Sequence, residues 1–255
     1  MKRFCNVCWI ALATVSFLAA ADATYLGKWK LNPAKSQLTG ETVSIEQSPS
    51  GGMRYVSAET AYDFKLDGKE YPTPGGSMAA WKEAGPDTWD VTIKTNGQLV
   101  ATIQLTVKGD TLTSMAHRPK AGGGMLMDTS TLKRVSGGPG IVGKWKSTEV
   151  KQSASALEIS SDGPDSLTLT VPEFGLACMA KFDGKDYAMT GPQAAPKEKY
   201  SFKKTGANSF QMTEKIDGKA VYVDKFTVSA DGKTLTDDGT PISRKEPTKA
   251  VYDRQ

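Results

Sequence analysis

The string Gly-Lys-Trp-Lys occurs twice in the chain, at residues 27–30 and again at residues 143–146. Three further pairs of segments match in the same order: 64–71 with 180–187, 87–100 with 208–221, and 129–135 with 249–255. A repeat of this length is a whole domain rather than a short solenoid unit. We therefore predict two duplicated domains, residues 24–135 and 141–255, joined by a Gly- and Pro-rich linker at residues 136–140.

Residues 1–23 have the features of a secretory signal peptide. Lys2 and Arg3 precede an apolar run from Val7 to Ala20, and residues 21–23 form a small-x-small cleavage site. The run is short for a transmembrane helix, and no later stretch approaches the length of one. We therefore expect an exported protein, periplasmic or secreted, with no membrane span once the leader is removed.

Charge and cysteine content narrow the possible partners. The formal net charge is +4, and the lysines are interspersed with acidic residues rather than grouped. We therefore predict no nucleic-acid partner. Loss of the leader would remove Cys5 and Cys8, which leaves Cys178 alone and allows no internal disulfide.

Apolar and polar residues alternate over short stretches in each copy, which is typical of half-buried strands. Examples are residues 43–45 and 89–93, and turn dipeptides such as Asp67-Gly68 separate the stretches. No amphipathic helix is apparent after the leader. These features predict an all-β protein made of two tandem antiparallel up-and-down β-barrels of about eight strands each, because closure leaves no exposed sheet edge.

One hairpin allows the register to be predicted. A two-residue turn at Asn96-Gly97 would place the apolar residues of its second strand on the face opposite to those of the first. A three-residue loop at residues 95–97 would instead pair Ile93 with Leu99 and bring both apolar sets to one face. We therefore predict the three-residue loop.

Two tryptophan–arginine pairs are predicted to close the barrels. Trp29 and Trp145 lie on the first strand of each copy, and Arg134 and Arg254 lie at matching places on the last strand. The first and last strands of a closed barrel are neighbours, so a guanidinium can lie over an indole face. We expect Arg134 to cover Trp29 and Arg254 to cover Trp145, as plugs at the barrel bases. A tryptophan that lines a ligand site is the alternative.

Because Gly27-x-Trp29 goes with Arg134, and Gly143-x-Trp145 with Arg254, the chain resembles the lipocalin-like, or calycin-type, β-barrel proteins. In particular it is similar to those that bacteria export and whose roles are mostly unassigned, here as a tandem duplication. The resemblance implies either a cup that binds a small apolar molecule or a barrel filled by its own side chains.

The sequence shows no catalytic or metal-binding constellation. His117 is the single histidine, which is too few for a zinc site, and no nucleophile elbow accompanies it; we expect it on the surface or in a loop. Cys178 aligns with Tyr62 and is predicted to be a buried, inert thiol. The glycines at 122–124 are predicted to form a flexible loop near a barrel mouth. We therefore predict no enzyme, no cofactor and no metal.

The second copy has two acidic residues where the first copy is apolar. Ile93 and Ile103 align with Glu214 and Asp224, which should point into the second barrel. A buried carboxylate is costly unless paired, so both should bind something or lie near the open end. A local register slip that leaves both in solvent is the alternative. The predicted register separates them by about 13 Å along the strand, too far for a glycosidase pair.

The candidate ligand-binding residues are Glu214, Asp224, Tyr222 and Cys178, all at predicted inward positions of the second copy. We expect an exported, non-enzymatic protein that binds a small apolar molecule or a lipid inside a barrel. Two alternatives stay open. One is a structural or protein-interaction module with solid barrels, and the other is an enzyme that uses Glu214 or Asp224 as a base.

Overall fold

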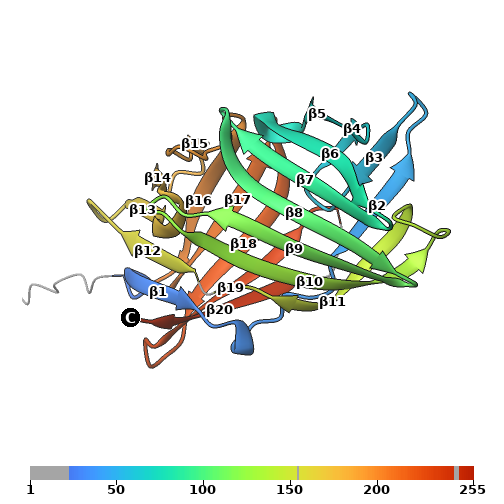
Figure 1. Cartoon of the computed structure of the whole chain (residues 1–255). Helices are drawn as coiled ribbons and strands as arrows, with labels where there is room; N and C mark the ends of the chain where they lie inside the picture. Colours follow the sequence, from blue (N-terminus) through green and yellow to red (C-terminus); the bar gives the residue numbers. More distant parts are fainter. Residues whose placement is uncertain (1–22, 154, 244–246) are drawn as a thin grey trace, which may run out of the picture.

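The computed structural model describes residues 23–153, 155–243 and 247–255, so all but the last residue of the predicted signal peptide lies outside it. The described chain is all β apart from three short 3₁₀ helices, η1 (Pro33–Lys35), η2 (Pro74–Gly76) and η3 (Pro172–Phe174). The strands form two antiparallel sheets of ten strands, and each curls until its end strands meet (Figure 1). Two tandem, nearly closed barrels are therefore confirmed, with ten strands each rather than about eight.

The first sheet, here called the N-barrel, is one continuous stretch of chain in which β2 and β11 lie side by side. Its strands are β2 (Thr42–Gln47), β3 (Met53–Val56), β4 (Ala61–Phe64), β5 (Asp67–Pro72), β6 (Ser77–Gly85), β7 (Thr88–Thr95), β8 (Gln98–Lys108), β9 (Thr111–Pro119), β10 (Met125–Ser136) and β11 (Gly143–Lys151).

The second sheet, here called the C-barrel, joins the first strand of the chain to the last nine. β1 lies between β12 and β20, where Figure 1 shows the blue strand beside the red one. Its strands are β1 (Gly27–Leu31), β12 (Ala156–Ser160), β13 (Ser166–Val171), β14 (Leu176–Lys181), β15 (Tyr187–Ala188), β16 (Glu198–Gly206), β17 (Ser209–Ile216), β18 (Lys219–Val228), β19 (Thr234–Pro241) and β20 (Thr248–Arg254).

The two copies of the duplication have exchanged their first strands. β1, with the first Gly-Lys-Trp-Lys string, belongs to the C-barrel, and β11, with the second string, belongs to the N-barrel. Trp29 pairs with Arg254 in β20, and Trp145 pairs with Arg134 in β10. Each of the predicted ranges 24–135 and 141–255 therefore contains strands of both barrels.

The predicted linker at residues 136–140 covers the end of β10 and part of the six-residue connection, 137–142, between β10 and β11 inside the N-barrel. Ser136 at the end of β10 pairs with Lys144 near the start of β11. A Cβ on Gly137 would lie 2.5 Å from the Cα of Gly143, so the two backbones approach too closely for any side chain at this place. The connection returns β11 directly onto β10 instead of leading the chain to the second barrel.

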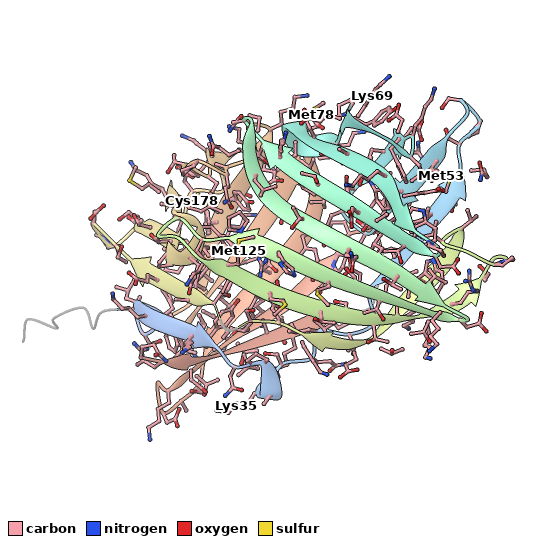
Figure 2. The ribbon with its side chains drawn as sticks, in the orientation of Figure 1. Lys35, Met53, Lys69, Met78, Met125 and Cys178 are labelled. Atoms are coloured by element: carbon pink, nitrogen blue, oxygen red, sulfur yellow. The ribbon has the colours of Figure 1, made fainter. Side chains whose placement is uncertain are left out.

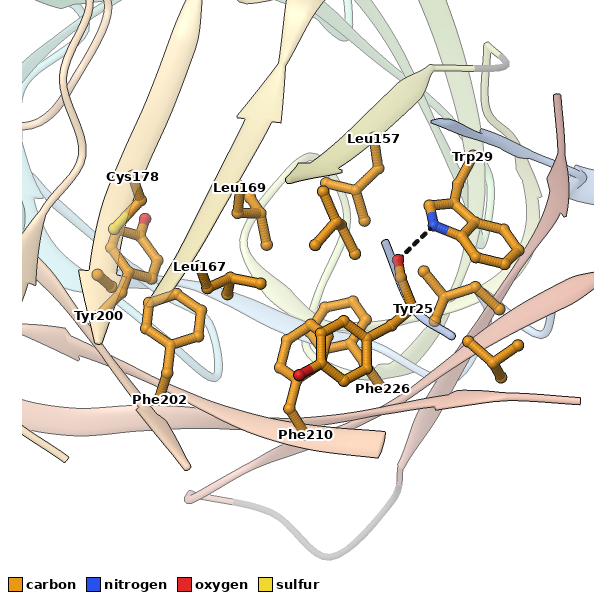
Figure 3. Packing of buried hydrophobic residues seen from close by; sticks show 14 residues of the cluster. Tyr25, Trp29, Leu157, Leu167, Leu169, Cys178, Tyr200, Phe202, Phe210 and Phe226 are labelled. Atoms are coloured by element: carbon orange, nitrogen blue, oxygen red, sulfur yellow. Dashed lines mark hydrogen bonds between the residues drawn. The ribbon is translucent and has the colours of Figure 1, made fainter. Parts of the chain in front are cut away.

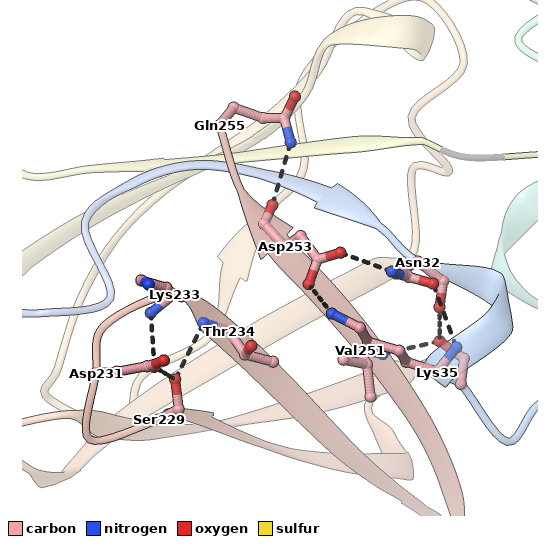
Figure 4. Close-up of polar contacts among 10 residues, drawn as sticks. Asn32, Lys35, Ser229, Asp231, Lys233, Thr234, Val251, Asp253 and Gln255 are labelled. Atoms are coloured by element: carbon pink, nitrogen blue, oxygen red, sulfur yellow. Dashed lines mark hydrogen bonds and ion pairs between the residues drawn. The ribbon is translucent and has the colours of Figure 1, made fainter.

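Polar contacts hold the segment after β1 against the C-barrel (Figure 4). The Asn32 side chain donates to one carboxylate oxygen of Asp253 at 2.6 Å, and the Lys35 ammonium lies 2.7 Å from the other. The Val251 N–H donates to the Ser36 hydroxyl at 2.9 Å. These bonds attach η1 to β20, and only after them does the chain cross to β2 of the N-barrel.

The turn between β7 and β8 differs from the prediction. Thr95 pairs with Gln98, so the turn contains two residues, not three. Both of them, Asn96 and Gly97, have positive φ values, 51° and 75°, which are the signs of a type I′ turn. Asparagine and glycine are the residues that adopt this conformation at least cost.

A bulge in β8 restores the apolar face that the three-residue loop was expected to produce. Ile93 pairs with Ala101 and Lys94 pairs with Leu99, which leaves Val100 as the extra residue. Residues 89, 91 and 93 then share a face with residues 101, 103 and 105. The single apolar face was predicted correctly, but the loop and the pairing of Ile93 with Leu99 were wrong.

Both cores contain paired aromatic rings. In the C-barrel the Phe210 and Phe226 rings stack with centroids 4.7 Å apart, and Tyr25 meets Phe210 edge-on at 5.0 Å (Figure 3). In the N-barrel Phe64 stacks on Trp81 at 4.3 Å. Such ring pairs add specific geometry to the burial of apolar area.

Large apolar side chains are exposed at separate places, among them Met125 on β10 (Figure 2) and Met179 on β14. In the part of the chain that the structure describes, no helix has the length and apolar character needed to cross a membrane.

Candidate functional site

An arginine covers a tryptophan at the base of each barrel. The guanidinium carbon of Arg134 lies 4.0 Å from the centroid of the Trp145 ring, and that of Arg254 lies 4.0 Å from the Trp29 ring. Each indole N–H donates to a carbonyl four residues earlier in the chain, at 2.9 Å. The predicted stacking therefore exists in both barrels. The predicted partners were wrong, because the strands that carry the tryptophans have changed places.

The opposite ends of the barrels, here called the mouths, face each other. The Asn96 side chain in the β7–β8 turn donates to the Ala194 carbonyl at 3.1 Å, and the Lys197 N–H donates to the Gly75 carbonyl at 3.1 Å. The Gln193 side chain reaches two further carbonyls of the N-barrel, each at 3.3 Å. The segment of the C-barrel that precedes β16 thus lies across the mouth of the N-barrel.

A cavity of about 410 Å³ extends from the interior of the N-barrel to this junction. Its apolar wall includes Val43, Ile45, Trp81, Val91, Ile103 and Leu132. Glu198, Glu214 and Ile216 of the C-barrel also line it, on the side of the mouth. A mostly apolar hollow of this size is typical of a site for a small molecule.

The junction end of the cavity is acidic. Its lining includes Glu41 and Glu59 from the N-barrel, and Glu198 and Glu214 from the C-barrel, and no described residue of the lining is a lysine, arginine or histidine. β16 and β17 place Glu214 opposite Tyr200, whose hydroxyl donates to Glu198 at 3.1 Å. The sheet therefore holds two carboxyl groups next to each other at the mouth.

Burial favours the protonated form of these two groups. Burial raises the pKa of Glu214 to about 8, and the nearby Glu198 carboxyl contributes to the rise. Burial also raises the pKa of Glu198, and the hydrogen bond from Tyr200 opposes that rise. No described residue donates a hydrogen bond to the Glu214 carboxyl. A hydrogen-bond donor on a molecule in the cavity can therefore pair with the Glu214 carboxyl.

A second pair of acids lies within the C-barrel. Asp224 is 6% exposed, and its carboxyl group lies close enough to that of Asp237 for each to affect the pKa of the other. Burial is the main reason that the pKa of both acids is raised. A Cβ on Gly239 would lie 2.9 Å from a carboxylate oxygen of Asp224, so the glycine leaves room for this group. The pair can share a proton without an external ligand.

The structure brings one of the four predicted ligand-binding residues to the cavity. Glu214 and Asp224 both point inward, as predicted, but only Glu214 is among the lining residues. The Tyr222 hydroxyl is bonded to the Thr248 hydroxyl. Cys178 is fully buried, and burial raises the pKa of its thiol to about 11, as expected for an inert thiol.

The predicted distance between Glu214 and Asp224 was wrong. A bulge at Val221 places Asp224 opposite Met212 instead of Phe210. The two acids are therefore offset by two residues, about 7 Å along the strand. The two acids differ in their surroundings. Asp224 lies beside Asp237, whereas Glu214 faces the cavity.

Two hydroxyls in the cavity wall are buried without a hydrogen-bond partner, those of Ser147 and Thr60. Ser147 is 5% exposed and lies two residues after Trp145 on β11, so both side chains point inward. The Ser147 N–H donates to the Glu41 carbonyl at 2.8 Å, which places its hydroxyl at the acidic end. An unpaired buried hydroxyl is costly, and a polar group of a ligand can satisfy it.

The other predicted features lie outside the cavity. His117 is on β9 rather than in a loop, and it lines an outer hollow with Lys82 and Asp90. The loop at 122–124 joins β9 to β10 and, through the adjacent Ala121 N–H, bonds to the C-barrel at 2.7 Å. Among the described residues, no three His, Cys, Asp or Glu side chains are grouped so that they could hold a metal ion.

Glu198, Glu41, Glu59 and Ser147 were not predicted. Glu214 was found because its counterpart in the first copy is apolar. Glu198 lies in the region where the second copy carries an insertion, so no counterpart marks it. Glu41, Glu59 and Ser147 become part of one site only because the mouths of the two barrels meet. The residue pattern within a single copy does not indicate that contact.

Comparisons with known proteins give no relative: no family model, no curated protein and no solved structure matches the chain.

Proposed function

We propose that the protein binds a small, mainly apolar molecule in the cavity of the N-barrel. The observation that carries this proposal is the cavity of about 410 Å³ with its apolar wall. Trp145 and Arg134 close the barrel base, and the C-barrel covers the mouth. An apolar molecule that enters such a space leaves water, and this is the main source of binding free energy.

The two barrels have different parts in this proposal. The C-barrel is packed with aromatic rings, and it serves as the cover that supplies Glu198 and Glu214. The N-barrel holds the ligand. A module with two solid barrels is the alternative, and the cavity favours ligand binding over it. The role is binding rather than catalysis.

We also propose that the chain is a lipocalin-like protein that is exported. The Gly-x-Trp strings with an arginine over each indole support the first part. The basic start, the apolar run and the small-x-small site within residues 1–23 support the second.

A cavity-filling substitution tests the binding site. Ser114 lines the cavity from β9, and Ser114→Phe would place a ring inside it. We expect the affinity for a neutral fluorescent probe, N-phenyl-1-naphthylamine, to fall by about tenfold or more, equivalent to ~1.4 kcal/mol. Fluorescence titration of the folded protein measures this.

The matched control is Thr113→Phe, which adds a similar ring one residue earlier, where the side chain points away from the cavity. It should leave the probe affinity within about twofold of the parent. The absence of saturable binding to the parent protein, or an equal loss in both variants, would contradict the proposed site.

A further inference from the structure

We infer that the ligand carries a positively charged group, such as a primary ammonium, and that Glu214, Glu198 and Ser147 bind this group at the junction end of the cavity. The inference rests on the proposed function, because it assumes that the apolar part of the ligand occupies the N-barrel. It names the ligand class as a small cationic amphiphile, an apolar chain or ring system with an amine at one end.

The first argument is the charge of the cavity. Glu198 and Glu214 line its junction end, and the Glu198 carboxyl adds negative charge near Glu214. Glu214 receives no hydrogen bond from a described residue. An ammonium donates up to three hydrogen bonds, and a hydrogen bond between charged partners is about twice as strong as a neutral one. A ligand with an ammonium group therefore supplies the hydrogen-bond donor that the Glu214 carboxyl group lacks.

The second argument is independent of the acids. The Ser147 hydroxyl is buried, has no hydrogen-bond partner and lines the same cavity. Its backbone N–H is bonded to the backbone carbonyl of Glu41, which also lines the cavity. A hydroxyl can accept a hydrogen bond from the same ammonium that a carboxylate binds. The wall thus offers acceptors of two kinds at one end and apolar surface elsewhere.

The groups that face Glu214 determine how binding depends on pH. Glu198 and Tyr200 come from β16, Tyr222 and Asp224 come from β18, and Glu59 comes from the N-barrel. None of these carries a positive charge, and the acids among them oppose ionisation of Glu214. A bound ammonium reverses this effect, so binding of a cation releases a proton. Affinity for a cation should rise with pH, and affinity for a carboxylate ligand should fall.

Three ligands with the same number of carbon atoms and different head-group charge, decylammonium, decanol and decanoate, distinguish the effect of charge on affinity from that of the apolar chain. We expect the full-length mature chain at pH 9 to bind decylammonium about tenfold or more tightly than decanol, with decanoate the weakest. This preference should shrink at pH 6, where Glu214 holds its proton. Isothermal titration calorimetry in buffers of different ionisation enthalpy measures the affinities and the released proton.

Glu214→Gln removes the charge and keeps the shape. The variant should lose the preference for decylammonium, by about tenfold, and should retain its affinity for decanol. Glu83→Gln, on an exposed part of β6, is the matched control and should change neither.

The outcomes separate this inference from the proposed function. If decanol binds but decylammonium binds no better, or if Glu214→Gln leaves the preference intact, the cationic class is wrong and the apolar site stands. If neither decanol nor decylammonium binds, the proposed function itself fails.

Discussion

Each barrel is closed at its base by one arginine that performs two tasks. Arg134 lies over the Trp145 ring at 4.0 Å, and its guanidinium also donates to the Gly140 carbonyl at 2.9 Å and to the Val142 carbonyl at 3.2 Å. Its Nε–H donates to Asp110 at 3.0 Å. A planar guanidinium can stack and donate in its own plane at once, whereas the ammonium of lysine cannot.

Removal of this group should weaken the fold. We expect Arg134→Ala to lower the free energy of unfolding by about 2–4 kcal/mol, because the cation–π contact and several hydrogen bonds to backbone carbonyls are lost together. Urea denaturation measures the change. Lys133→Ala, the exposed neighbour on β10, should change it by no more than about 0.5 kcal/mol. Equal effects of the two substitutions would show that the arginine does not close the barrel.

The buried acids should make stability depend on pH. The folded-state pKa of Glu214 is raised to about 8, above its value in the unfolded chain. Between about pH 4.3 and pH 8 the folded protein therefore holds a proton that the unfolded chain has lost. The contribution of Glu214 to the free energy of unfolding is fully present below that range. It falls as pH rises through the range, by about 1.4 kcal/mol per pH unit for each such proton.

Denaturation curves between pH 5 and pH 8 measure this slope, and Glu214→Gln should make it shallower. Asp224 and Asp237 have raised pKa values as well, so the free energy of unfolding of that variant should still fall with pH, but less steeply. A parent protein whose stability is constant or rises over this range would contradict the burial of these groups.

Comparison of the two copies revealed the inward acids, because Ile93 and Ile103 stand where the second copy has Glu214 and Asp224. An apolar counterpart indicates an inward position even when the residue itself is polar. The same reasoning could not find Ser147 or Glu198. Their role depends on the junction of two barrels, which leaves no mark in the alternation of residues along a strand.

At the scale of strands, the alternation of residues predicted which face is buried but not which strand pairs with which. β1 and β11 both carry Gly-Lys-Trp-Lys, and each can fill the same place beside an arginine strand. The connecting segments determine which barrel each of these two strands joins. A turn with close backbone contact at Gly137 and Gly143 returns β11 onto β10, and η1 attaches the end of β1 to β20.

This arrangement predicts which fragment folds. Residues 41–151 contain all ten strands of the N-barrel and the Arg134–Trp145 pair. We expect this fragment to be monomeric and to unfold cooperatively, as seen by size-exclusion chromatography and thermal circular dichroism. The fragment 41–142 lacks β11 and exposes the edges of β2 and β10, so it should aggregate. An unfolded 41–151 fragment would contradict the assignment of β11 to this barrel.

At the scale of the whole molecule, the exchange interlocks two barrels whose mouths meet. One core includes the stacked rings of Phe210 and Phe226, and the interior of the other barrel has a cavity that both barrels line. Composition could not predict this difference, because larger residues at some inward positions of the second copy, such as Tyr222 for Ala101, offset smaller ones at others, such as Cys178 for Tyr62. Whether a barrel is hollow depends on the complete packing.

Disulfide trapping tests the exchange of first strands most directly. Lys28 in β1 pairs with Glu158 in β12, whereas closure of each copy on itself would pair Lys28 with Ser44, the partner that Lys144 has in this structure. Cysteines at paired strand positions are close enough to form a disulfide. In the chain from residue 24 onward, we predict that mild oxidation crosslinks Lys28→Cys/Glu158→Cys within one chain and leaves Lys28→Cys/Ser44→Cys reduced, as read by peptide mass mapping. The reverse result, a crosslink to position 44 and none to position 158, would contradict the exchange and the junction of the two mouths that depends on it.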